Sequence, residues 1–173
     1  MLSLPWSTRF AGQAPSVAGK GTPATLLLER AGVAHTVHAY EPGPGPYAAA
    51  AAAALGVEPD RLLKTLLADL DGRLVCGVVP ASGSLDLKAL ATALGGKRAV
   101  LADPAAAERS SGYVVGGISP LGQRTALPTA VDETVELYDT VYVSAGRRGL
   151  SLELAPVDLL RLTGAVVADL ARP

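Results

Sequence analysis

Two apolar runs separated by a two-residue turn constrain the fold of this chain more than any other feature. The runs cover residues 62–70 and 73–80, and only Asp71-Gly72 stands between them. Runs of this length that are rich in Leu and Val predict strands, and Asp-Gly is a strong signal for the tight turn of a hairpin. The sequence therefore predicts a long antiparallel β-hairpin in the middle of the chain.

Helix and strand signals alternate around this hairpin. A hydroxyl followed by proline predicts a helix that begins at Thr22-Pro23 and stops near Gly32, and an acidic cap predicts another at Asp103-Pro104. This mixed order predicts a single α+β domain with a mixed sheet over residues 22–173, after a flexible extension at 1–21. The other elements that we expect are helices at 48–54, at 86–94 and from Pro156, and strands at 35–40, 98–102, 113–115, 129–131, 140–144, 150–154 and 166–170.

The charge balance and the few metal-binding side chains narrow the function. A net charge of −1 argues against tight, indiscriminate binding to nucleic acid, which needs an excess of Lys and Arg. The single cysteine, Cys76, excludes an internal disulfide, and the spacing of His35 and His38 puts them on opposite faces of a strand. These residues do not form a metal site, so we expect none. Because no apolar run is long enough for a membrane and no signal peptide is recognisable, we also expect a cytoplasmic protein.

Lys64 stands in the apolar part of the first predicted strand. On a period of two it shares one face with Leu66 and Ala68, while Leu63, Thr65 and Leu67 share the other. A lysine in this setting either reaches the rim of the sheet or lines a polar cavity. In a cavity its ammonium group can orient a carbonyl, a phosphate or a ribose hydroxyl, and the residues alone leave both interpretations open.

Two glycine-bearing loops are further candidates for chemistry. Adjacent glycines in Gly116-Gly117 allow several backbone N–H groups to point into one concavity, which suits an oxyanion, although such a connection is often only a turn. The loop at 144–149 carries Arg147 and Arg148, which either bind a phosphate or are solvated surface charges. The chain contains no familiar nucleophile or metal motif.

Several segments, taken in order, carry a resemblance to a known family: Thr22-Pro23-Ala24, the strand that ends at Tyr40, Lys64-Thr65-Leu66-Leu67, Gly83-Ser84-Leu85-Asp86-Leu87-Lys88, Arg109-Ser110-Ser111-Gly112-Tyr113, Gly116-Gly117-Ile118-Ser119-Pro120-Leu121-Gly122 and Tyr142-Val143-Ser144. Together they resemble the YbaK/EbsC group of bacterial Cys-tRNA(Pro) deacylases, which is similar to the editing domain inserted in bacterial prolyl-tRNA synthetases. The resemblance covers residue 22 to the end and implies a curved, mixed β-sheet with surrounding helices.

The resemblance implies a trans-editing enzyme that removes mischarged cysteine from tRNA(Pro) without a metal or cofactor. The implied mechanism is substrate-assisted, because the cysteinyl thiol attacks its own ester carbonyl. The implied partners are the acceptor end of aminoacyl-tRNA and prolyl-tRNA synthetase, with no membrane. By this resemblance the catalytic residues are Lys64, Gly116 and Gly117, and the substrate-binding residues are Tyr40, Tyr47, Thr65, Ile118, Ser119, Pro120, Ser144 and Ser151.

Two positions depart from the family pattern. Ser151 stands where many relatives carry Asp, and Tyr47 stands where Phe is more usual. These departures leave open a deacylase for another small amino acid, such as alanine, or a non-catalytic module that binds tRNA or a synthetase. For the editing mechanism we expect the Lys64 ammonium group to face a cavity that Gly116-Gly117 frames.

Overall fold

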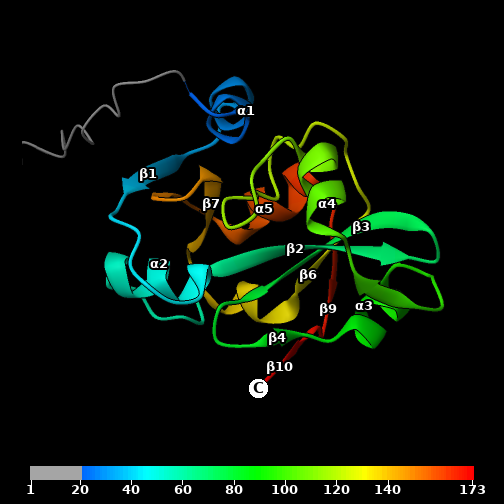
Figure 1. Cartoon of the computed structure of the whole chain (residues 1–173). Helices are drawn as coiled ribbons and strands as arrows, with labels where there is room; N and C mark the ends of the chain where they lie inside the picture. Colours follow the sequence, from blue (N-terminus) through cyan, green and yellow to red (C-terminus); the bar gives the residue numbers. More distant parts are fainter. Residues whose placement is uncertain (1–20) are drawn as a thin grey trace, which may run out of the picture.

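The computed structural model describes residues 21–173, which form the single α+β domain that the sequence predicts (Figure 1). Apart from Gly21, the extension predicted at 1–21 lies outside the described residues. The helices are α1 (Pro23–Ala31), α2 (Tyr47–Leu55), α3 (Leu87–Ala93), α4 (Pro104–Ser111), the 3-10 helix η1 (Glu133–Leu137) and α5 (Pro156–Thr163). The strands are β1 (His35–Ala39), β2 (Leu63–Leu70), β3 (Arg73–Pro80), β4 (Ser84–Leu85), β5 (Ala99–Leu101), β6 (Thr129–Asp132), β7 (Val141–Arg147), β8 (Leu150–Leu154), β9 (Val166–Ala168) and β10 (Ala171–Arg172).

Local capping signals place most helix ends where the sequence predicts them. The side chain of Thr22 accepts a hydrogen bond from the Thr25 N–H at 3.1 Å, so α1 begins at Pro23. It ends at Gly32, whose φ of 65° is easily reached only without a Cβ. Asp86 and Asp103 cap α3 and α4 in the same way as Thr22. These ends therefore follow from the local sequence.

The strands are divided among three sheets, of which the largest is mixed. It has the order β5-β2-β3-β6-β9; β2 pairs antiparallel with β3 and β5, whereas β3, β6 and β9 run parallel. The predicted hairpin forms its centre, with Leu63 opposite Pro80 and Leu70 opposite Arg73. A three-stranded antiparallel sheet, β1-β8-β7, lies beside it, and β10 pairs with β4.

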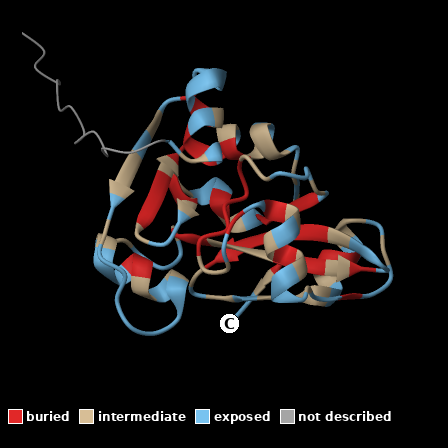
Figure 2. Ribbon diagram, turned by 45° about the horizontal axis from the view of Figure 1, so that its top comes forward, coloured by how far each residue is buried: buried red, intermediate tan, exposed pale blue. Residues whose placement is uncertain are grey.

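Each face of the β2–β3 hairpin packs into its own apolar cluster. Leu63, Leu67 and Val78 belong to a cluster that includes α1, α5 and the inner face of the three-stranded sheet. Ala68, Val75 and Val79 belong to a second cluster that is closed by α3. The buried residues accordingly run along both sides of the central strands (Figure 2). Packing on both faces therefore holds the hairpin in place, and with it the residues along its edge.

One predicted strand, at residues 113–115, does not exist. The chain leaves α4 at Gly112, and the Tyr113 ring turns into the core, where its hydroxyl donates to the Leu121 carbonyl oxygen at 2.7 Å. The Val115 N–H donates to the Glu108 carboxylate at 3.0 Å instead of to a neighbouring strand. The prediction is wrong because side chains, not a sheet, satisfy the polar groups of this segment.

Within residues 21–173, no helix has the length and apolar character needed to cross a membrane.

Candidate functional site

A cavity of about 540 Å³ opens along one edge of β2. Strand β2 pairs with β3 along its whole length but with β5 only at residues 68–70, so within the described chain its edge at residues 64–67 meets no strand of that sheet. The Ala81 N–H donates to the Leu62 carbonyl at 2.7 Å. Because backbone groups alternate along a strand, those of Lys64 point toward β3 and those of Thr65 point toward the open edge.

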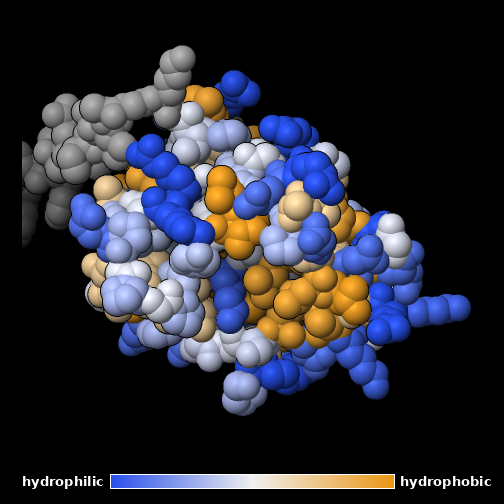
Figure 3. Space-filling view, viewed as in Figure 1, coloured by the Kyte–Doolittle hydropathy of each residue, from blue (hydrophilic) through white to orange (hydrophobic). Residues whose placement is uncertain are grey.

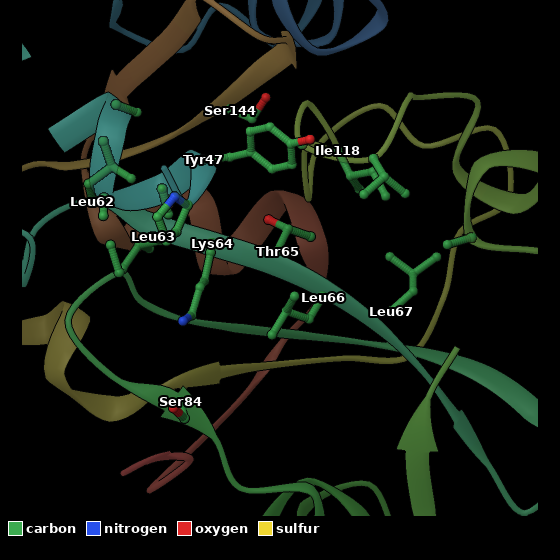
Figure 4. Close-up of a pocket in the computed structure, with 18 of the residues that line it drawn as sticks. Tyr47, Leu62, Leu63, Lys64, Thr65, Leu66, Leu67, Ser84, Ile118 and Ser144 are labelled. Atoms are coloured by element: carbon green, nitrogen blue, oxygen red, sulfur yellow. The ribbon is translucent and has the colours of Figure 1, made fainter. Parts of the chain in front are cut away.

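Lys64 and Thr65 point to opposite sides of β2 and so to opposite ends of the cavity. Figure 4 shows the Lys64 side chain directed toward Ser84, whereas Thr65 points toward Tyr47 and Ile118. Lys64 is one of the residues that line the cavity. Its ammonium group, however, lies on the Ser84 side and not on the side of the glycine loop. The cavity therefore has a cationic end and a hydroxyl-lined end.

Two polar groups in the cavity have no partner in the described part of the chain. Lys64 is half-buried and forms neither an ion pair nor a side-chain hydrogen bond within residues 21–173. Thr65 Oγ1 is buried and is the one such side-chain atom of the described residues without a hydrogen-bond partner. A buried hydroxyl without a partner costs about 1–3 kcal/mol. Both groups are therefore suited to a polar ligand that completes their interactions.

The glycine loop closes the other side of the cavity through close backbone contact. Gly116 has a φ of 90°, and a Cβ on Gly117 would approach the Arg147 Cα to 2.8 Å. The Gly117 carbonyl accepts from Ser144 Oγ at 2.9 Å, while its N–H donates to the Val114 carbonyl at 2.9 Å. The Gly117 N–H is thus already used, whereas the N–H of Gly116 donates no hydrogen bond within residues 21–173.

Most of the site residues expected from the sequence line this one cavity. Those that do are Lys64, Gly116, Tyr40, Tyr47, Thr65, Ile118, Ser144 and Ser151. The other three expected residues, Gly117, Ser119 and Pro120, are not among those that line the cavity. Ser119 is fully buried, and its hydroxyl accepts the Leu121 N–H at 3.2 Å, so it shapes the turn. Strand β7 supplies Ser144 and its partner strand β8 supplies Ser151, directly opposite in register.

Arg148 was expected only as a phosphate ligand or a solvated charge, and the structure gives it a contact of a different kind. Its guanidinium lies 4.0 Å from the centre of the Tyr47 ring and donates to the Tyr47 hydroxyl at 2.6 Å and to the Val115 carbonyl at 2.9 Å. Arg148 thus joins α2, the glycine loop and the β7–β8 turn. We call this exposed contact, beside the lining residues Tyr47 and Val115, the mouth of the cavity. No sequence signal pairs residues that are 101 positions apart.

The mouth also exposes apolar side chains. Leu101 of β5 is 58% exposed, and it lines the cavity with Leu66 and Pro104. Figure 3 shows an apolar area right of centre on the face seen in Figure 1. Ser82 and Ser84, which follow β3, line the Lys64 end and were missed as site residues. The Gly83-Ser84 turn directly after the hairpin was the signal that could have found them.

A separate polar network lies beyond the cavity, on the same face of the three-stranded sheet as Ser151. Glu153 accepts from His38 Nε2 at 2.8 Å and from the Thr140 hydroxyl at 2.7 Å. Burial raises the pKa of Glu153, but these hydrogen bonds outweigh it, so that the net pKa is lowered. Within residues 21–173, no three His, Cys, Asp or Glu side chains are grouped as metal ligands.

Cys76 lies on β3, opposite Leu67 of β2. Its thiol is buried, and burial raises its pKa to about 12. A thiol in this state is a poor nucleophile, and Cys76 is not among the residues that line the cavity. This agrees with the sequence interpretation of Cys76 as a core residue.

Fold and cavity together define a single α+β domain with a cavity between an open strand edge and a glycine loop. The chain belongs to the family of aminoacyl-tRNA editing domains, whose sequence model matches residues 43–162. The resemblance to the YbaK/EbsC group is thereby confirmed.

Individual relatives agree with this assignment. The chain is 39% identical over 119 residues to EbsC of Enterococcus faecalis, a proposed Cys-tRNA(Pro)/Cys-tRNA(Cys) deacylase, which covers 68% of this chain and 72% of that protein. It is 31% identical over 99 residues to ProXp-y of Escherichia coli K12, a multifunctional Ser/Thr-tRNA deacylase, covering 57% of this chain and 59% of that one. The crystal structure of a proposed trans-editing enzyme for prolyl-tRNA synthetase superposes with a TM-score of 0.76 and 28% identity over 87% of this chain and 96% of that one.

Proposed function

We propose that this protein is a trans-editing deacylase that releases mischarged cysteine from tRNA(Pro). Its relatives indicate aminoacyl-tRNA deacylation, and EbsC, for which cysteine is proposed as the amino acid, is 39% identical. The observation that carries the proposal is the cavity itself. It brings together, in a space of about 540 Å³, an ammonium group and a buried hydroxyl that both lack a partner within residues 21–173, and a glycine loop.

The two ends of the cavity support a division of roles. Lys64 points toward Ser84, so its ammonium group is placed to hold the terminal ribose or a phosphate of the acceptor end (Figure 4). Thr65, Ser144 and Ser151 line the opposite end, which leaves that end for the aminoacyl group. In this arrangement the Gly116 N–H is the available backbone donor for the carbonyl oxygen, because the Gly117 N–H is bonded to Val114.

The chemistry needs no nucleophile from the protein. The cysteinyl sulfur forms a bond to its own ester carbonyl, the bond from that carbon to the ribose oxygen breaks, and the thiol proton goes to the ribose oxygen. The products are a small thiolactone, which water opens afterwards, and the free 3′ end of the tRNA. The protein holds the aminoacyl group in the reactive pose and stabilises the developing negative charge, which together can remove several kcal/mol from the barrier.

A second candidate is deacylation of another small amino acid, such as alanine or serine. The hydroxyl-lined end of the cavity favours serine in particular, because Thr65 and Ser151 can hydrogen-bond a polar side chain as readily as a thiol. The similarity to ProXp-y, named for Ser and Thr, points the same way. In this case a water molecule would have to attack the ester in place of the thiol.

A deacylation panel separates these functions. Purified protein is incubated with tRNA(Pro) charged with Cys, S-methyl-Cys, Ala, Ser or Pro, and the release of the amino acid is followed over time. We expect rapid release of Cys only. Release of Ala or Ser at the same rate as Cys would establish the second candidate, and release of S-methyl-Cys would exclude thiol attack. Binding of the charged tRNA with no release of any amino acid would identify a non-catalytic module.

Prolyl-tRNA synthetase is the proposed partner. A chain with a net charge of −1 has little excess positive charge for phosphate contacts, so we expect weak tRNA binding by the protein alone. Addition of the synthetase should then increase the deacylation rate at physiological salt. Tight tRNA binding without the synthetase at that salt concentration would contradict this expectation.

A further inference from the structure

The cavity has an unusual charge composition for a site that receives an amino acid ester. Lys64 is its one fully charged lining residue, and no Asp or Glu lines it within residues 21–173. The first 20 residues of the chain contain no Asp or Glu either, so that segment has no carboxylate side chain to contribute. The phenols of Tyr40 and Tyr47 also line the cavity; they donate and accept hydrogen bonds but are not carboxylates.

The carboxylates of Glu108, Glu153 and Asp60 each accept hydrogen bonds from other groups of the protein. Glu108 accepts the Val115 N–H at 3.0 Å behind the glycine loop, and Glu153 is bonded to His38 and Thr140. Asp60 is exposed and accepts a hydrogen bond from the Ser82 hydroxyl at the Lys64 end. At the mouth, Arg148 adds a second positive charge, stacked on Tyr47. Lys64 therefore gives the lining of the cavity a positive charge that no lining carboxylate balances within residues 21–173.

A positive cavity disfavours a positive ligand group. The α-amine of an amino acid ester is an ammonium ion when protonated, and removing it from water without a carboxylate partner is unfavourable. Lys64 adds repulsion between like charges, which disfavours the protonated form further. The hydroxyls of Thr65 and Ser151 can instead donate to, or accept from, an uncharged nitrogen.

We infer that the cavity binds the aminoacyl group with its α-nitrogen uncharged, as a neutral amine or as an N-acylated amide. The inference rests on the proposed function, in that it takes the ligand to be an aminoacyl ester of the tRNA 3′ end. It adds a selection that the family assignment does not contain: the protein distinguishes protonation states, and it accepts esters whose nitrogen carries an acyl cap.

Two non-hydrolysable analogues test this selection. In both, alanine is joined by an amide to 3′-amino-3′-deoxyadenosine, and in one of them the α-nitrogen is acetylated. Calorimetry gives the Kd of each at about pH 6 and about pH 9, on either side of the usual α-amino pKa of about 7.7–8.0. We expect the uncapped analogue to bind at least about tenfold more tightly at the higher pH, and the capped analogue to bind equally at both. Because the capped analogue cannot titrate, it controls for changes in the protein.

The outcomes separate this inference from the proposed function. Equal or tighter binding of the uncapped analogue at the lower pH would overturn the inference while supporting an acceptor-end site. Failure of both analogues to bind at either pH would overturn both. The expected pattern combined with no release from any charged tRNA would leave the inference standing and remove the catalytic function.

Ser151→Asp provides a positive control, because it places a carboxylate inside the cavity. With this variant the uncapped analogue should bind more tightly at the lower pH, reversing the wild-type order. Ser151→Asn is the matched uncharged control and should keep the wild-type order. Asp60→Asn should also bind the uncapped analogue more tightly at the higher pH, since the Asp60 carboxylate already accepts a hydrogen bond from the Ser82 hydroxyl. Loss of the pH dependence in this variant would contradict the inference. If Ser151→Asp does not fold, the wild-type comparison of the two analogues decides alone.

Discussion

The cavity lies between two walls that are built in different ways. The strand wall, residues 63–67 of β2, is held by the ladder to β3. The loop wall, residues 113–118, is joined to the rest of the domain by hydrogen bonds between side chains and backbone, among them those of Tyr113, Ser144, Arg148 and Glu108. A ladder is insensitive to any one side chain, whereas each bond of the loop wall depends on one residue. The strand wall therefore fixes the position of the chemistry, and the loop wall can be adjusted by single substitutions.

The largest expected effect comes from the chemistry of the strand wall. Lys64→Ala should lower the rate of Cys-tRNA(Pro) deacylation at least about 100-fold, because among residues 21–173 it removes the one ammonium group that lines the cavity. The β2–β3 ladder does not involve this side chain, so circular dichroism and thermal unfolding should change little. Lys64→Met, which keeps the apolar stem, should be equally inactive, and the exposed Lys97→Ala should be fully active. Unchanged rates in Lys64→Ala would remove this residue from the mechanism.

The loop wall should respond to added bulk where its backbone packs most closely. Gly117→Ala brings a Cβ to 2.8 Å from the Arg147 Cα, a backbone atom that cannot rotate away. We expect a loss of about 2 kcal/mol in the free energy of unfolding, measured by urea denaturation, together with slower deacylation. Gly43→Ala is the control, since nothing lies within 4 Å of its added Cβ. Equal stability of the two variants would show that the loop wall moves to accommodate the added Cβ without a loss in the free energy of unfolding.

Removal of one hydrogen bond should loosen the loop wall by a smaller amount. Tyr113→Phe leaves the buried Leu121 carbonyl without its donor, which is expected to lower the free energy of unfolding by about 1.5 kcal/mol. Tyr138→Phe removes a hydroxyl that donates no hydrogen bond within residues 21–173, so its stability should remain near that of the wild type. A Tyr113→Phe variant as stable as Tyr138→Phe would mean that the 113–118 segment is held by packing alone.

The exposed contact at the mouth should contribute least to stability. Tyr47→Phe removes the hydroxyl that accepts from Arg148 but keeps the stacked ring, and we expect a change within about 0.5 kcal/mol. Its consequence should instead appear in KM for the charged tRNA, because the guanidinium is then free to reorient. Arg148→Ala should alter KM in the same direction, and Arg147→Ala, which lacks these contacts, serves as the control. A changed kcat with unchanged KM would contradict a role at the mouth.

Cys76 offers a direct test of the difference between the walls, with no change as the expected result. Its thiol lies beneath the strand wall, and its pKa is raised to about 12, so alkylation by iodoacetamide at neutral pH should be very slow. Tyr113→Phe and Tyr47→Phe loosen only the loop wall and should leave this rate as in the wild type. Faster alkylation in either variant would show that the two walls open together.

Much of the fold follows from signals that act over a few residues. Asp71-Gly72 closes the hairpin with the predicted register, and Thr22, Asp86 and Asp103 cap helices where they were expected. The failed prediction at residues 113–115 has the opposite cause. A Tyr-Val-Val segment has strand propensity, but the Tyr113 hydroxyl finds the Leu121 carbonyl and the Val115 N–H finds Glu108, so tertiary contacts override propensity.

The sequence by itself determined that Lys64 and Thr65 lie on opposite faces of one strand, because side chains alternate with a period of two in any extended chain. It also placed Gly116, Ser144 and Ser151 in the candidate site, by resemblance. Only the tertiary structure decided that β2 pairs with β5 no further than Ala68, which leaves the cavity edge of β2 open. It also decided that the Arg148 guanidinium contacts Tyr47. Which edge is left uncovered, and which side chains meet across it, depends on the packing of distant elements, and no local pattern encodes that.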